Sequence, residues 1–82
     1  MTTAVLICDD SAMARKQIAR ALPEGWDVSI RFSADGREAL DAVSRGQADV
    51  LFLDLNMPGM DGYEVLAEVG RRDLSTVVIV VS

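Results

Sequence analysis

Apolar residues along this chain fall into two kinds of segment that alternate with one another. Three segments are short, continuous and rich in β-branched residues, a pattern typical of parallel strands buried on both faces: Ala4–Cys8, Val50–Leu53 and Val77–Val81. In a fourth segment, Val28–Phe32, apolar and polar residues alternate. This alternation predicts a strand with one buried face and one solvated face, as at the edge of a sheet.

Three segments between these strands carry the periodicity of amphipathic helices: Ala12–Leu22, Asp35–Arg45 and Asp61–Arg72. The second and the third each begin with an Asp that is followed three residues later by a Glu, which is the spacing of a capping box. The residues expected to face the core are Ala14, Ile18, Ala21 and Leu22 in the first helix, Ala39, Leu40 and Val43 in the second, and Leu66 and Val69 in the third.

Strands and helices alternate through the whole chain in the order β-α-β-α-β-α-β. Such a run of right-handed crossovers predicts an α/β fold, in which helices cover both faces of a mostly parallel sheet. Two arrangements suit this order: half of a Rossmann fold, or a flavodoxin-like sheet whose second strand lies at the edge beside the first. The solvated face of Val28–Phe32 favours the flavodoxin-like three-layer sandwich.

The composition is that of one small globular domain, with 82 residues of which 50% are hydrophobic and 26% charged. A net charge of −5 argues against binding of this segment to nucleic acids or to anionic membranes. The apolar runs are too short to span a bilayer, and no signal peptide precedes the first strand. We therefore expect a cytoplasmic location.

The chain has a single cysteine, Cys8, and no histidine. A lone cysteine excludes a disulfide within the chain and suits a reducing compartment. The same counts exclude zinc sites and the Ser-His-Asp and Cys-His catalytic arrangements. We expect Cys8 to be a core residue, so that carboxylate chemistry is what remains.

Acidic residues follow two of the predicted buried strands at the point where each strand ends. Asp9 and Asp10 come directly after Ala4–Cys8, and Asp54 comes directly after Val50–Leu53. The first and third strands are neighbours in the flavodoxin-like order, so the three carboxylates should converge at the carboxyl edge of the sheet. Like charges this close repel one another and attract a cation, and a set of oxygen ligands suits Mg²⁺.

Ordinary structural explanations compete with this metal site. Asp10 together with Ser11 can cap the helix that begins at Ala12, and for Asp10 alone capping and ligation are equally supported. Asp9 has no capping role, and a second acid beside the first costs repulsion unless something binds. Asp54 ends an otherwise apolar strand, where an unpaired charge is expensive, and this favours a functional role.

Four stretches of the chain resemble response-regulator receiver domains of the bacterial chemotaxis CheY type: CDDSAMARK, FSADGREAL, VLFLDLNMPGMDGYEVL and VVIVVS. The resemblance runs from Ala4 to Ser82, and the Asp-Asp pair joined to the DLNMPGMDG loop at this separation makes it specific. It implies a role in two-component phosphorelay signalling. Asp54 would accept a phosphoryl group from a histidine kinase or a phosphotransfer protein, and the domain would then switch conformation.

The resemblance also implies roles for the other residues of the site. Asp10 and Asp54 would bind Mg²⁺ directly together with the backbone carbonyl of Asn56, whereas Asp9 would act mainly through water. Ser82 would be the switch hydroxyl that moves to bond the phosphoryl oxygen. These roles agree with the chemistry, because phosphoryl transfer is catalysed mainly by positioning and by neutralising charge on the transferred oxygens.

The chain departs from the family in lacking a phosphate-binding lysine. Receiver domains carry this lysine at the end of a fifth strand, whereas the only lysine here is Lys16, on the first predicted helix. At about 25 residues for each βα unit, five units need roughly 125 residues. Residues 1–82 are therefore expected to be the N-terminal part of a receiver domain that lacks the last helix, strand and helix. Two arrangements stay open for the complete protein: a receiver that stands alone, or a receiver with an output domain C-terminal to it.

This interpretation leaves Val77–Val81 as an open edge with neither proline nor charge to protect it. We expect residues 1–82 by themselves to associate through this edge, to exchange elements with a second copy, or to fold only where the missing segment is supplied.

Three alternatives remain open at this point. A phosphohydrolase of the haloacid-dehalogenase type also uses an aspartate nucleophile and Mg²⁺, but it needs a second Asp where this chain has Asn56, which cannot act as the general acid. A nucleotide-binding Rossmann half would need a glycine-rich turn, whereas Asp9 and Asp10 would face the phosphates. A degenerate receiver used only for docking is disfavoured by the acids that are present.

Overall fold

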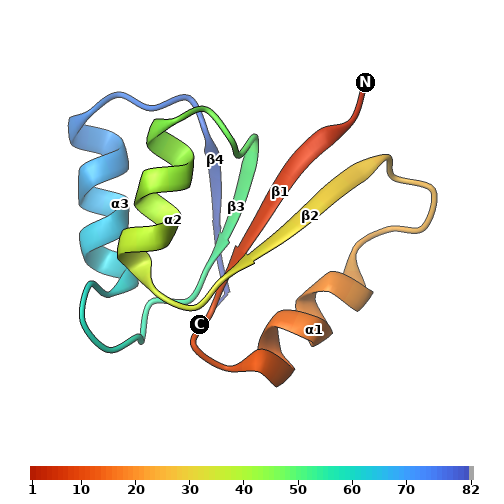
Figure 1. Ribbon diagram of the computed structural model, residues 1–82, viewed down its shortest axis with the longest axis horizontal. Helices are drawn as coiled ribbons and strands as arrows, with labels where there is room; N and C mark the ends of the chain where they lie inside the picture. The colour runs from red at the N-terminus through yellow and green to blue at the C-terminus, as the bar shows by residue number, and fades with distance from the viewer. Residues whose placement is uncertain (82) are drawn as a thin grey trace.

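The structure is a computed structural model that describes residues 1–81, and its elements follow the predicted order (Figure 1). The strands are β1 (Thr3–Cys8), β2 (Val28–Ser33), β3 (Val50–Leu53) and β4 (Val77–Val80). The helices are α1 (Ala12–Ala21), α2 (Gly36–Ser44) and α3 (Gly62–Arg71). Every boundary lies within one residue of the prediction.

The four strands form one parallel sheet in the order β2-β1-β3-β4. In a Rossmann half the third strand would pair beyond the second, whereas here β1 lies between β2 and β3, so the flavodoxin-like arrangement is confirmed. The register aligns Cys8 with Ser33 on β2 and with Leu53 on β3. The carboxyl ends of these strands therefore lie level with one another at one edge of the sheet.

Helices α2 and α3 lie together on one side of the sheet, and α1 lies on the other side (Figure 1). The main core fills the space between the sheet and the α2–α3 layer, and the predicted inward side of α2 is confirmed by its buried residues. In α3 the predicted Val69 is buried, but the second buried apolar residue is Val65, whereas the predicted Leu66 is only half-buried. The buried cluster consists of Leu6, Cys8, Ala39, Leu40, Val43, Ala48, Leu51, Leu53, Met57, Val65 and Val69.

The predicted capping residues begin α2 and α3. The Asp35 carboxylate accepts a hydrogen bond from the Glu38 backbone N–H at 2.8 Å, and Asp61 accepts one from the Glu64 backbone N–H at 3.0 Å. Each bond satisfies one of the four backbone donors that a helix leaves free at its N-terminus. The two caps thus fix where the loops after β2 and β3 turn back over the sheet.

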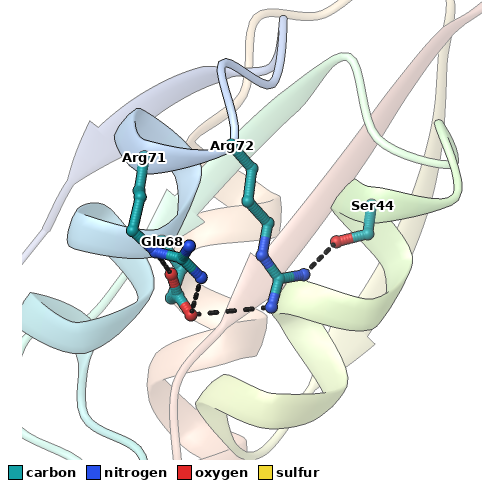
Figure 2. Close-up of polar contacts among 4 residues, drawn as sticks. All are labelled: Ser44, Glu68, Arg71 and Arg72. Carbon is teal, nitrogen blue, oxygen red and sulfur yellow. Dashed lines mark hydrogen bonds and ion pairs between the residues drawn. The ribbon is translucent and has the colours of Figure 1, made fainter.

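The C-terminal turn of α3 carries a surface ion-pair cluster that also contacts α2 (Figure 2). Arg71 holds Glu68 through two bonds, at 2.6 Å from Nε and 2.9 Å from Nη2, and lowers the pKa of the Glu68 carboxyl. Arg72 lies 3.5 Å from the same carboxylate and donates a 3.1 Å hydrogen bond to the Ser44 hydroxyl at the end of α2. These contacts are exposed, so we expect them to add little to stability.

Helix α1 packs more loosely than the sequence predicts, because none of its residues is fully buried. Ala14, Ile18 and Leu22 are half-buried and Ala21 is exposed. On the sheet below it, Val5 and Ile7 of β1 are buried, at 1% and 0% exposed. The helix therefore covers β1 and leaves the two edge strands, β2 and β4, open on this side of the sheet.

The two edge strands, β2 and β4, expose apolar side chains. On β2, Ile30 and Phe32 are 36% and 47% exposed. The prediction that this strand buries its apolar face is therefore wrong for these two residues. They pair with Val5 and Ile7 and so share the α1 side of the sheet, where α1 packs mainly on β1 and leaves these two side chains largely uncovered. The prediction that β4 is buried on both faces is also wrong, because Val77, Ile79 and Val80 are 59%, 41% and 44% exposed.

In the part of the chain that the structure describes, none of the helices combines the length and the apolar character that crossing a bilayer requires.

Candidate metal and phosphoryl-acceptor site

The backbone of the candidate site continues the sheet one residue beyond its strands. The Asp9 backbone N–H donates to the Ser33 carbonyl at 3.1 Å, and the Asp54 backbone N–H donates to the Cys8 carbonyl at 3.0 Å. Asp9 and Asp54 are therefore held side by side by the same hydrogen-bonding pattern that pairs β1 with its neighbours. Their positions are thus set by the rigid part of the fold.

The three carboxylates predicted to converge do so. Asp9, Asp10 and Asp54 each offer a carboxylate oxygen, and these oxygens all lie within 4.8 Å of one another. Asp9 and Asp54 are buried, at 7% and 9% exposed, whereas Asp10 is exposed. Two buried carboxylates and a third that is exposed to solvent form a strongly negative cluster at this edge of the sheet.

Two of these side chains also make local hydrogen bonds. Asp9 Oδ1 accepts from the Ser11 backbone N–H at 2.9 Å, and Asp54 Oδ1 accepts from the Asn56 backbone N–H at 3.1 Å. Asp9 therefore has a structural partner that the sequence did not suggest. The N-cap of α1 is Ser11, so capping does not occupy the Asp10 side chain.

The donor set and its spacing fit a small hard cation. Ligand oxygens lie about 2.1 Å from Mg²⁺, so two ligands of one ion are at most about 4.2 Å apart. The observed limit of 4.8 Å between the three oxygens exceeds that span by less than an ångström. Small side-chain rotations, or a water between one acid and the ion, would complete the coordination.

Cys8 is the core residue that the sequence predicts, although it lies next to the acids. It is fully buried, its thiol donates to the Asp35 carbonyl at 3.4 Å, and its sulfur lies 3.6 Å from the Met57 sulfur. Burial raises the pKa of the Cys8 thiol to about 11, with smaller contributions from the charges of Asp35, Asp9 and Asp54. The thiol is therefore protonated at neutral pH and is no nucleophile.

The loop between Asp54 and α3 is folded tightly back on Asp54. A Cβ atom on Gly62 would overlap the Asp54 carbonyl oxygen and lie 2.6 Å from Leu55 Cα, so only glycine fits there. The Gly62 N–H donates to the Leu55 carbonyl at 3.3 Å, and Met57 is buried in the core. These contacts hold Asn56 beside the acids, and Asn56 itself is exposed to solvent.

Two supporting residues were not predicted from the sequence. Ser33 is 2% exposed, and its hydroxyl donates to the Asp35 carbonyl at 2.8 Å while its own carbonyl receives the Asp9 N–H. Arg15 on α1 donates from Nη1 to the Asp9 carbonyl at 2.7 Å. Because side chains on a helix are tilted toward its N-terminus, a long side chain at Arg15 can reach the loop that precedes α1. This is the one feature of the sequence from which the contact could have been predicted. The predicted switch residue, Ser82, lies outside the described residues.

A family model for the response regulator receiver domain matches residues 5–82. Among curated proteins, the chain is 44% identical over 80 residues to a protein-glutamate methylesterase/protein-glutamine glutaminase of Treponema pallidum. That match covers 96% of this chain and 20% of the relative. The chain thus spans about a fifth of the length of this relative, and the relative's name refers to its full-length protein.

Solved structures show the same likeness. The signal receiver domain of the putative response regulator NarL from Mycobacterium tuberculosis is 35% identical with a TM-score of 0.83, and the match covers 96% of this chain and 64% of that one. The receiver domain of the histidine kinase CKI1 from Arabidopsis thaliana, complexed with Mg²⁺, is 30% identical with a TM-score of 0.77. That second match covers 98% of this chain and 67% of the other.

Proposed function

This chain belongs to the response regulator receiver family, the phosphoacceptor modules of two-component signalling, and we propose that Asp54 is its phosphoryl acceptor. The observation that carries the proposal is the convergence of Asp9, Asp10 and Asp54 within 4.8 Å at the end of β1 and β3. We further propose that a histidine kinase or a phosphotransfer protein donates the phosphoryl group. The protein would act in the cytoplasm.

In the proposed reaction an oxygen of the Asp54 carboxylate attacks phosphorus, and the bond from phosphorus to the donor nitrogen breaks. The product is an acyl phosphate on Asp54 and a free histidine on the donor. Because Oδ1 accepts the Asn56 N–H at 3.1 Å, we assign the attack to Oδ2. The same N–H fixes the carboxylate against rotation, so that the nucleophile is held ready for an in-line approach.

Asp10, Asp54 and the backbone carbonyl of Asn56 would hold Mg²⁺ directly, and Asp9 would act through a water. The bond from the Ser11 N–H to Asp9 Oδ1 supports an indirect role for Asp9, because one of its oxygens is already engaged. When bound, the ion neutralises charge between the carboxylates and the phosphoryl oxygens. The solved Arabidopsis receiver complexed with Mg²⁺ supports the assignment of this metal.

The remaining family functions are proposed for parts outside the described residues. Ser82 would supply the switch hydroxyl. A further helix, strand and helix would complete the domain, with a phosphate-binding lysine at the end of the added strand, because this chain covers 64% of a matched receiver. An output domain would follow, as in the much longer relatives, one named as a methylesterase and one as an alginate biosynthesis regulator. The receiver itself would be no separate enzyme, although it assists its own phosphorylation and dephosphorylation.

The test is phosphorylation of the full-length protein with acetyl phosphate, followed by mass spectrometry. We expect a mass gain that requires Mg²⁺, is abolished in Asp54→Asn, and is retained in Asp49→Asn. Asp49 is a matched control because it precedes β3 at the opposite end of the same strand and accepts the Ala4 N–H at 2.8 Å, a bond that asparagine can keep. Phosphorylation that persists in Asp54→Asn, or that proceeds undiminished in EDTA, would contradict the proposal.

A further inference from the structure

Arg15 is a cation of α1 that contacts the loop carrying the acidic cluster. Its Nη1 donates a 2.7 Å hydrogen bond to the backbone carbonyl of Asp9, and its side chain is half-buried. A guanidinium that bonds a carbonyl at this distance makes a charge-assisted hydrogen bond, which is stronger than a neutral one. The bond spans from the second turn of the helix back to the residue that ends the β1 ladder.

The carbonyl that Arg15 contacts belongs to the peptide that joins Asp9 to Asp10. The orientation of this peptide decides where the two acidic side chains point relative to Asp54. Asp9 makes two other hydrogen bonds. Its backbone N–H donates to the Ser33 carbonyl at 3.1 Å, and its carboxylate accepts from the Ser11 backbone N–H at 2.9 Å. Neither of these bonds touches the Asp9–Asp10 peptide plane, so Arg15 makes the contact that fixes it.

Arg15 affects the site in two ways that have opposite signs. As a positive charge near the acids, it opposes the binding of a second cation. As a hydrogen-bond donor to the loop, it favours a geometry in which Asp9 and Asp10 face Asp54. Lys16 separates these effects, because it is the next residue on α1, lines the same shallow hollow beside Phe32, and is exposed.

We propose that Arg15 is a positioning residue for the divalent-cation site, and that it raises the affinity for Mg²⁺ through its bond to the Asp9 carbonyl. The proposal rests on the proposed function, because it assumes that the acidic cluster binds this ion. The positioning effect exceeds the electrostatic one, since loss of a partner outside the ligand set commonly weakens metal binding about 10- to 100-fold. A single lost charge near the surface is screened by solvent and salt.

The experiment measures Mg²⁺ affinity by calorimetry at fixed ionic strength. It compares the full-length wild-type protein with its Arg15→Ala, Arg15→Lys and Lys16→Ala variants. We expect Arg15→Ala to weaken binding about 10-fold, although it removes a positive charge. Lys16→Ala removes the same charge without the bond and should leave affinity unchanged or slightly tighter. Arg15→Lys keeps the charge and a donor, and should recover part of the loss.

Equal affinities in Arg15→Ala and Lys16→Ala, or tighter binding in Arg15→Ala, would overturn the positioning role. Should Arg15→Ala fail to fold by circular dichroism, the comparison of Arg15→Lys with Lys16→Ala decides the question. A loss in the charge-conserving variant then supports positioning, and wild-type affinity in it contradicts positioning. If the wild-type protein itself binds no Mg²⁺, the proposed function fails, and that result is distinct from either outcome for Arg15.

Discussion

Gly62 at the start of α3 lies against the backbone of Asp54, so closely that a side chain on Gly62 would overlap the Asp54 carbonyl oxygen. The contact joins the first residue of a helix to the residue proposed to accept the phosphoryl group. The position of Asp54 is therefore set from two sides, by the β1 ladder through the Cys8 carbonyl and by the loop that returns through Gly62.

Gly62→Ala should destabilise the protein, because the new methyl group meets backbone atoms that cannot move aside. We expect a loss of about 1–3 kcal/mol in the free energy of unfolding, measured by denaturant titration. Gly70→Ala is the matched control, since nothing lies within 4 Å of a Cβ at that position of α3. It should stabilise by about 0.5–1 kcal/mol through helix propensity, and equal effects of the two changes would show that the close contact is absent.

Asp10→Asn should weaken Mg²⁺ binding more than Asp9→Asn. Asp10 is exposed and makes no capping bond, so its full carboxylate is available as a ligand, whereas Asp9 is buried and already accepts the Ser11 N–H. Calorimetry of Mg²⁺ binding would measure both. Asp27→Asn controls for loss of charge alone, because Asp27 lies at the other end of the sheet, where it bonds Thr2. Equal losses for Asp9 and Asp10 would mean that both act only through their charge.

Stability should fall in alkaline solution because of Cys8. Its thiol pKa is about 11 in the folded protein, against about 8.5 in an unfolded chain. Between these values the unfolded state releases the proton first and binds fewer protons than the folded state. The free energy of unfolding therefore decreases as pH rises through this window, by up to about 1.4 kcal/mol for each pH unit.

Denaturant titrations at pH 8 and at pH 10.5 would measure this effect. The Cys8→Ala variant should be less stable at pH 8, because it loses core volume, but it should lose less stability between the two pH values. Identical alkaline losses in wild type and variant would show that the thiol is not the group responsible.

The exposed edge and side chains of β4 should make residues 1–82 self-associate when expressed by themselves. Val77, Ile79 and Val80 are between 41% and 59% exposed, and an unprotected parallel edge strand can pair with another chain. Light scattering should show species larger than a monomer. Ile79→Lys should reduce the association, whereas Tyr63→Lys, at a residue of α3 that is 63% exposed, should not. A monodisperse wild-type monomer with strongly protected amides in β4 would contradict this expectation.

The sequence by itself determined the elements, their boundaries and the identity of the acids. Strands and helices could be located because their signals are local: continuous β-branched runs, helical periodicity, and the Asp–Glu caps that start α2 and α3. The acids could be placed at strand ends for the same reason. Their convergence also needed the strand order, which was adopted from the flavodoxin-like fold and which the structure confirms.

Contacts between segments far apart in the chain were decided only by the tertiary structure. The position of α1 over β1 leaves Ile30 and Phe32 exposed on a face predicted to be buried, and no local pattern in β2 indicates where a helix will lie. The bond from Arg15 to Asp9 and the close approach of Gly62 to Asp54 likewise depend on how a helix and a loop settle on the sheet. Periodicity fixes which side of an element is apolar, but the partner of that side is chosen by the packing of the whole chain.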